Sequence, residues 1–159
     1  MPLTALATII DPRHGLRADA TSGTGFTVAM DSVPSGHQPG GATPRELVLQ
    51  ALAGCTGMDV ATILRKKRQV ADSHEISVTA EARTDAHPHV FTRIVVEHRL
   101  AGQVEPEAAR RAVELSATRY CPVSAMLSAS VKIEHRYRLR RRGQPEVSAI
   151  VVITGPEAA

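Results

Sequence analysis

The strongest feature of the hydrophobic pattern is a stretch over residues 47–58 in which no side chain is charged. It lies inside a longer segment, residues 43–68, whose residue types predict a single helix with Cys55 at its middle. A helix that is apolar or small on every face is buried on every side. We therefore predict a long, buried central helix that crosses the core of the domain.

Both ends of this helix are marked by residue type. Thr43 can cap the first turn, and Pro44 suits the first helical position. Glu46 falls three residues after the cap and completes a capping box. Residues 65–68 are all basic, which the negative end of the helix dipole favours. The helix is thus expected to run from Thr43 to Arg68.

Shorter stretches with β-branched residues or a period of two predict strands on both sides of the helix. In chain order these stretches are residues 3–10, 16–21, 25–30, 75–83, 91–100, 131–139 and 148–154. The first three predict an N-terminal β-meander, which a loop over residues 31–42 joins to the helix. The next two predict a hairpin within a second, antiparallel sheet, and the last predicts an added edge strand.

Two further helices are predicted between the hairpin and the strand that follows it. One runs over residues 106–120 and the other over residues 122–130, with Cys121 between them. Pro122 separates the two helices, because proline breaks a helix but suits the first turn of the next one. The expected fold class is therefore α+β, with helices around Cys121.

Composition and charge narrow the class of protein. At 159 residues the chain is expected to form one domain, residues 1–139, with a C-terminal extension over residues 140–159. A net charge of +3, gathered toward the tail, and an aromatic content of 3% argue against a nucleic-acid partner. The sequence has no signal-peptide pattern and no run of about 18 apolar residues. We expect a cytoplasmic protein that does not bind membranes.

Cys55 and Cys121 lead the candidates for covalent chemistry. Burial in an apolar helix raises the pKa of a thiol, so by position alone Cys55 is an inert core residue. Cys121 stands at the start of a helix, where the dipole stabilises a thiolate, and is the predicted more acidic sulfur. Asp59, one turn after Cys55, either supports the sulfur or caps a neighbouring element, and we favour the cap.

No metal and no bound cofactor is predicted. The two cysteines lie far apart in the chain, and a structural zinc site needs four ligands, usually in close pairs. His87 and His89 form one close pair, but they flank Pro88 in a turn. His98 and His135 lie on strand faces, where they are expected to pack or to form hydrogen bonds.

Several motifs resemble the OsmC/Ohr family of osmotically inducible and organic hydroperoxide resistance proteins, and are most similar to its YhfA-type branch. These motifs are Pro44-x-Glu46-Leu47, Leu52-Ala53-Gly54-Cys55 and Tyr120-Cys121-Pro122-Val123-Ser124. The resemblance spans about residues 6–139. It implies an OsmC-like fold built as an intertwined homodimer with the long helices at its centre. Such a dimer would explain a central helix with so little charge.

The resemblance also implies a thiol peroxidase that reduces organic hydroperoxides in oxidative stress defence. Cys55 would attack the peroxide, and Cys121 would resolve the sulfenic acid as an intramolecular disulfide. An external dithiol reductant, such as a lipoyl group, would then reduce the disulfide. This order of attack is opposite to the dipole argument. We follow the family, because a nearby arginine can outweigh burial at Cys55.

Arg13, with Arg17 as the fallback, and Glu46 are the supporting site residues that the resemblance implies. The chain departs from the family pattern where the long helix starts. Thr43 replaces an asparagine, and Arg45 stands at the glutamate position, one residue before Glu46. A shift of one residue rotates a helical side chain by about 100°, so a cap alone also explains Glu46.

Two other functions stay open. One is a dimer of the same fold that binds a small hydrophobic ligand without redox turnover. The other is a structural protein with two unreactive thiols. An arginine beside Cys55 would favour the peroxidase, because arginine stabilises a thiolate and orients an oxyanion.

Overall fold

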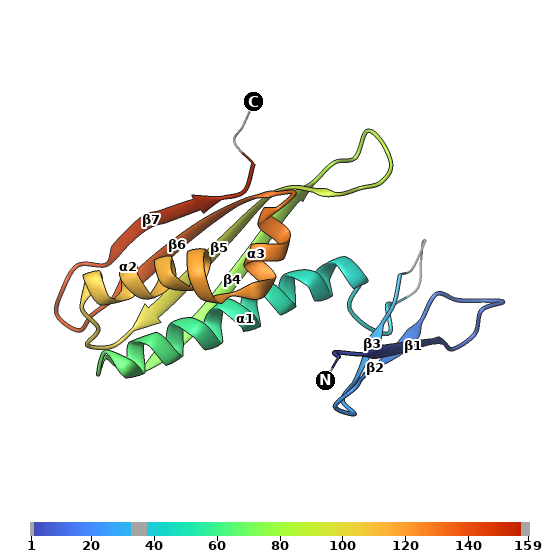
Figure 1. The fold of residues 1–159 in the computed structure, drawn as a ribbon, viewed down its shortest axis with the longest axis horizontal. Coiled ribbons are helices and arrows are strands. Elements are labelled where there is room, and N and C mark those ends of the chain that lie inside the picture. Colours follow the sequence, from blue (N-terminus) through green and yellow to red (C-terminus); the bar gives the residue numbers. More distant parts are fainter. Residues whose placement is uncertain (1, 33–37, 157–159) are drawn as a thin grey trace. The chain divides into compact units, whose positions relative to one another are not determined.

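The structure is a computed structural model that describes residues 2–32 and 38–156 (Figure 1). It divides into two compact units, Met1–Val48 and Leu49–Ala159. Helix α1 (Pro44–Lys66) begins in the first unit and continues in the second. Within the described residues, two sheets and three α-helices confirm the predicted α+β fold. The predicted division of the chain after residue 139 stays a prediction.

The first unit is built on a three-stranded antiparallel sheet, which confirms the predicted β-meander. Its strands are β1 (Ala5–Ile9), β2 (Ala18–Ser22) and β3 (Thr27–Met30). The predicted loop over residues 31–42 ends in a bridge between Met30 and Ala42, and its residues 33–37 lie outside the described part. Among the described hydrophobic residues of this unit, only Ala18 is buried. The sheet therefore has little core of its own.

The second unit contains a four-stranded sheet in the order β4-β5-β6-β7. Its strands are β4 (Ser73–Ala82), β5 (Phe91–Ala101), β6 (Lys132–Arg140) and β7 (Val147–Thr154). β4 and β5 form the predicted antiparallel hairpin, and β7 is the predicted edge strand. β5 and β6 are parallel, so the sheet is mixed and not antiparallel throughout as predicted. The helices between β5 and β6 form the long crossover that a parallel pair requires.

Three helical segments make this crossover: α2 (Pro106–Leu115), the π-helical turn η1 (Ser116–Tyr120) and α3 (Pro122–Ser128). The predicted helix over residues 106–120 is confirmed in place, but its last turn is π-helical. There the N–H of Cys121 donates to the carbonyl of Ser116, five residues back, at 3.0 Å. Cys121 is extended and caps α3, which Pro122 begins as predicted.

The two ends of α1 differ in how well they were predicted. At its start the Glu46 carboxylate accepts hydrogen bonds from the N–H and the hydroxyl of Thr43, which confirms the capping box. At its other end α1 stops at Lys66, two residues before the predicted Arg68. The reason is the left-handed conformation of Arg68, whose φ is 58°.

One face of α1 is buried within the chain, whereas the sequence pattern predicts burial on every side. The buried residues are Leu52, Thr56, Gly57, Val60 and Leu64. The opposite face leaves Met58 74% exposed. By length and composition alone α1 could cross a membrane, since its most apolar window has a mean hydropathy of 1.6. Its buried face nevertheless packs in hydrophobic clusters with β5, β6 and α2, as a core helix does.

Thr56 links α1 to the sheet and to η1 through buried hydrogen bonds. Its hydroxyl lies 3.1 Å from Nε2 of His98 on β5 and 2.9 Å from the hydroxyl of Ser116. The other ring nitrogen of His98 lies 2.9 Å from Nε2 of His74 on β4. Thr56, His98 and Ser116 are buried, so these polar groups depend on one another for partners. As predicted, His98 is a hydrogen-bonding core residue.

Replacing Thr56 with valine is expected to destabilise the protein by about 1–3 kcal/mol, because His98 Nε2 loses its buried partner while the packed volume is kept. Thr62→Val on the same helix is the matched control, since Thr62 is only partly buried. The control should change stability by less than about 0.5 kcal/mol. Urea unfolding followed by circular dichroism measures both. A Thr56→Val protein as stable as the wild type would contradict this account.

The stability of the fold should fall as the pH drops below about 6.5. Burial lowers the pKa of His98 to about 3 and that of His135 to about 4, from an ordinary value of 6.5. Below pH 6.5 the unfolded chain binds protons at both rings, whereas the folded chain does not until pH approaches 4 and then 3. The stability that the protein gains by keeping the two rings neutral is therefore fully present above pH 6.5 and is lost as pH falls.

Each ring is expected to lower the unfolding free energy by up to about 1.4 kcal/mol per pH unit across this window. Urea midpoints between neutral pH and pH of about 5 measure the slope. His135→Gln should reduce the slope, whereas His87→Gln, at an exposed turn position, should leave it unchanged. Midpoints that do not change with pH would show that the two rings are not buried in neutral form.

Candidate functional site

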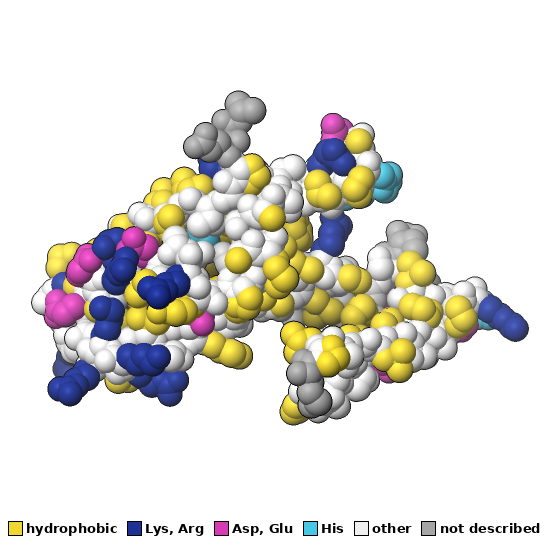
Figure 2. Space-filling view, in the orientation of Figure 1, with side chains coloured by type: hydrophobic (Ala, Val, Ile, Leu, Met, Phe, Trp, Pro, Cys, Tyr) yellow, Lys and Arg dark blue, Asp and Glu magenta, His cyan; other side chains and the backbone are white. Residues whose placement is uncertain are grey.

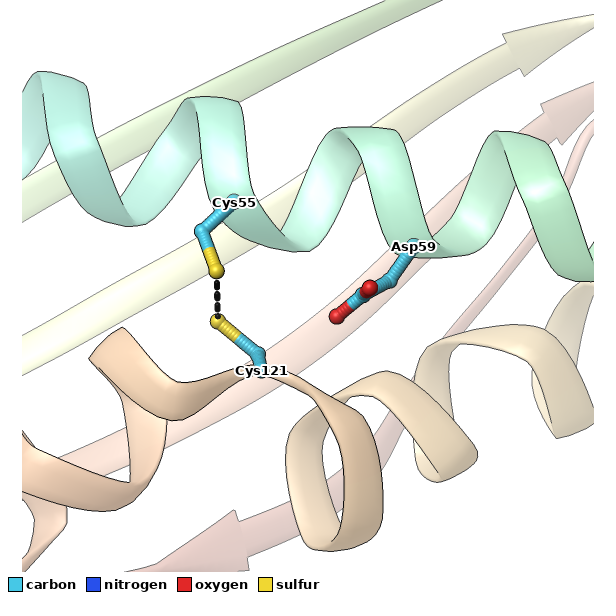
Figure 3. A group of neighbouring side chains, drawn as sticks. All are labelled: Cys55, Asp59 and Cys121. Atoms are coloured by element: carbon cyan, nitrogen blue, oxygen red, sulfur yellow. Dashed lines mark hydrogen bonds between the residues drawn. The ribbon is translucent and has the colours of Figure 1, made fainter. Parts of the chain in front are cut away.

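Cys55, in the middle of α1, faces Cys121, which stands between η1 and α3 (Figure 3). The two sulfur atoms lie 2.9 Å apart, and the Cys121 thiol donates to Cys55 Sγ. Both are free thiols; Cys55 is partly exposed, and Cys121 is 3% exposed. Because the sulfurs of a disulfide are about 2.05 Å apart, a small side-chain movement would suffice to join them.

Local structure explains how the two sulfurs meet. Cys55 directly precedes Thr56, so the hydrogen bonds that hold Thr56 against Ser116 also fix Cys55 on α1. Ser116 in turn accepts the π-helical hydrogen bond from the N–H of Cys121. Pro122 then begins α3 and leaves Cys121 extended at the junction. The same short segment, residues 116–121, therefore orients both cysteines.

Burial determines the protonation of Cys121. Burial, followed by the hydrogen bond with Cys55, raises the pKa of this thiol to about 12, although the N–H of Ser124 donates to the sulfur at 3.3 Å and acts in the opposite direction. The helix dipole predicts a stabilised thiolate and a lowered pKa at Cys121, and that prediction is therefore wrong in direction. α3 has only seven residues, so its dipole is too weak to offset the effect of burial on the pKa of Cys121.

Asp59 completes the group of side chains around the two sulfurs (Figure 3). One oxygen of Asp59 and the sulfurs of Cys55 and Cys121 all lie within 4.8 Å of one another. Oδ2 of Asp59 accepts a hydrogen bond from the Ser116 hydroxyl at 3.2 Å. Asp59 therefore belongs with the cysteines, through a side-chain contact and not as the helix cap that we favoured.

Arg13, Arg17 and Glu46 lie in the first unit. Arg13 is part of an exposed turn, where its N–H donates to Asp11, and the Arg17 guanidinium lies 3.7 Å from Asp19. The carboxylate of Glu46 is engaged in the capping box, and its hydrogen bonds from the Thr43 backbone and hydroxyl lower its pKa. A role of these three residues at the sulfurs stays a prediction.

Thr56 and Ser116 were missed as parts of this site. From the sequence, neither residue was assigned a role at the site. One signal was available for Thr56. It is four residues after Leu52 and four before Val60, so it is a polar residue in the middle of an apolar helical stripe. A buried hydroxyl in such a place needs a hydrogen-bonding partner.

A pocket of about 480 Å³ lies between α1 and the segment that leads to Cys121. Its lining residues are Met58, Asp59, Thr62, Ile63, Lys66, Lys67, Leu115 and Tyr120. Asp59 belongs both to this pocket and to the group around the sulfurs. The pocket combines an apolar wall with two lysines, which suits a ligand that has an apolar body and a polar or anionic end.

Comparison with known proteins agrees with the fold. Protein YhfA of Escherichia coli (strain K12) is 37% identical over 127 residues, which cover 79% of this chain and 92% of YhfA. An OsmC-like protein from Mycoplasma pneumoniae has a TM-score of 0.76 at 17% identity, over 88% of this chain and 98% of its own.

An organic hydroperoxide resistance protein OsmC from Legionella pneumophila has a TM-score of 0.60 at 14% identity, over 88% of this chain and 97% of its own. At these identities the two solved structures show likeness of fold alone. The family model for OsmC-like proteins matches residues 36–136. With the identity to YhfA, this match shows that the chain belongs to the OsmC-like family.

Proposed function

We propose that this protein is a cysteine-based peroxidase that reduces organic hydroperoxides in the cytoplasm and so protects against oxidative stress. The observation that carries the proposal is the distance of 2.9 Å between the sulfurs of Cys55 and Cys121. A sulfenic acid formed on one sulfur would meet the other thiol at once, which prevents further oxidation.

The proposed reaction has three steps. The sulfur of Cys55 attacks the terminal oxygen of the peroxide, the O–O bond breaks, and the alcohol leaves with a proton while Cys55 becomes a sulfenic acid. The Cys121 thiol then attacks Cys55 Sγ, and water leaves as the disulfide forms. An external dithiol, for example a lipoyl group, reduces the disulfide and restores both thiols.

The electrostatics of the pair support this order of attack. Cys121 donates its S–H to Cys55, so the Cys121 sulfur already points at the sulfur that becomes the sulfenic acid. The raised pKa of Cys121 keeps it protonated until a sulfenic acid forms beside it. The more exposed sulfur, Cys55, is also the one that a peroxide reaches first.

The pocket that Asp59 lines supports an organic substrate. Its apolar wall, which includes Met58, Ile63 and Leu115, would hold the carbon chain of a hydroperoxide near Cys55. The same pocket supports the alternative, a non-catalytic dimer that binds a small hydrophobic ligand. The two proposals differ in whether the thiols react.

One equivalent of cumene hydroperoxide is expected to consume both thiols of the reduced protein and to form a Cys55–Cys121 disulfide, located by mass spectrometry. Cys55→Ser should abolish the reaction. Cys121→Ser should still react and should accumulate a sulfenic acid that dimedone traps. Two free thiols that survive excess peroxide would rule out the peroxidase and leave ligand binding.

A homodimer is part of this proposal. α1 presents an exposed apolar face that includes Met58, and the first unit exposes 70% of Leu6 and 81% of Phe26. Figure 2 shows hydrophobic side chains open to solvent on the visible face of the molecule. A single chain gains no hydrophobic stabilisation from these side chains, whereas a second copy that covers them would.

Light scattering coupled to size-exclusion chromatography should therefore give twice the mass of one chain. Leu6→Lys and Met58→Lys should each weaken dimerisation at least about tenfold, because each puts a charge in place of an apolar group that the second copy would bury. Gln144→Lys, at an exposed polar position, is the control and should leave the dimer intact, because it removes no exposed apolar group. A wild-type protein that is monomeric at all concentrations would contradict the proposal.

A further inference from the structure

We propose that Cys55, Asp59 and Cys121 form a binding site for a thiolate-binding divalent metal ion of the Zn²⁺ class when both thiols are reduced. Metal binding does not depend on peroxidase activity, although it uses the same two sulfurs. The sequence gives no hint of this site, because the two cysteines are 66 residues apart and lie on different elements.

The donor atoms have nearly the required geometry. The two sulfurs and one Asp59 oxygen all lie within 4.8 Å of one another. In a tetrahedral zinc site with Zn–S bonds of about 2.3 Å and a Zn–O bond of about 2.0–2.2 Å, neighbouring ligand atoms are roughly 3.4–3.8 Å apart. The sulfurs, now 2.9 Å apart, would separate by less than about 1 Å to receive the ion.

Groups outside the donor set already orient two of the three donors. The Ser116 hydroxyl donates to Asp59 Oδ2 at 3.2 Å, and the Ser124 N–H donates to Cys121 Sγ at 3.3 Å. Ser116 is itself hydrogen-bonded to Thr56, and all three of these supporting residues are buried. Buried partners of this kind fix ligand orientation at metal sites and raise affinity.

Charge and ligand type point to the class of ion. Two sulfurs and one carboxylate suit Zn²⁺ or a similar transition metal, whereas Ca²⁺ and Mg²⁺ require oxygen ligands throughout. Binding replaces two S–H bonds with two metal–sulfur bonds and releases two protons. The doubly charged ion then offsets three adjacent negative groups. The fourth position would face the pocket that Asp59 lines, where water or a small ligand can complete the tetrahedron.

The two reactions of the site exclude each other. A disulfide between Cys55 and Cys121 removes both thiolate donors, so oxidation would release the metal. A bound metal would in turn occupy the sulfur that attacks a peroxide. The reduced site would therefore hold either an ion or a substrate.

Anaerobic titration of the reduced, tag-free protein with Co²⁺ tests the site. The expected result is one ion per chain, with a near-ultraviolet sulfur-to-cobalt charge-transfer band and the visible bands of a tetrahedral ion. About two protons should be released per ion. Zn²⁺ should displace Co²⁺, and protein that carries the Cys55–Cys121 disulfide should give no band.

Three variants identify the ligands. Cys55→Ser or Cys121→Ser should abolish or halve the charge-transfer band, with circular dichroism confirming the fold. Asp59→Asn should bind at least tenfold more weakly, whereas Asp72→Asn, at an exposed carboxylate of the same unit, should bind as the wild type does. A reduced protein with no band, or an Asp59→Asn protein with wild-type affinity, would overturn the proposal.

The peroxide titration of chelator-treated protein separates the two proposals. If peroxide oxidises the thiols but Co²⁺ gives no band, the metal site is wrong and the peroxidase stands. If Co²⁺ binds but the thiols survive peroxide, the metal site stands alone.

Discussion

The hydroxyl of Thr56 is the contact on which the site depends. It joins the middle of α1 to His98 on β5 and to Ser116 at the start of η1, in a region closed to water. A buried polar group that loses its partner is costly, so this link allows one orientation of α1 over the sheet. Cys55 and Asp59 flank Thr56 on the helix and are oriented with it. A hydrogen bond that contacts neither sulfur thus determines where the sulfurs lie.

The π-helical turn after α2 has a comparable role on the other side of the site. In an α-helix, side chains five residues apart point about 140° apart. Hydrogen bonding to the fifth residue widens the turn, and Ser116 and Cys121 can then both face α1. Ser116 contacts Thr56 and Asp59, while Cys121 contacts Cys55. Such turns are frequent at functional sites, and here the turn supplies one sulfur and the support for the carboxylate.

Redox chemistry and metal binding place the same demand on this group of residues. Both need two sulfurs that approach each other closely. The raised pKa of Cys121 keeps its thiol protonated, so the two thiolates do not form together spontaneously. Reaction at Cys121 therefore requires a partner that takes up or displaces the thiol proton. A sulfenic acid on Cys55 is one such partner, and a cation is another. The carboxylate of Asp59 distinguishes them, because only the cation uses it directly.

The sequence by itself determined the features that arise between near neighbours in the chain: the capping box of Thr43 and Glu46, the alternating strands, and the break at Pro122. Family motifs singled out Cys55 and Cys121 as candidate site residues. Only the tertiary structure decided which face of α1 is buried, that β5 and β6 are parallel, and that Asp59 and Ser116 join the cysteines. The acidity of Cys121 shows the reason. The dipole of its own helix can be inferred from the sequence, but the stronger effect, burial against α1 and the sheet, comes from residues far away in the chain.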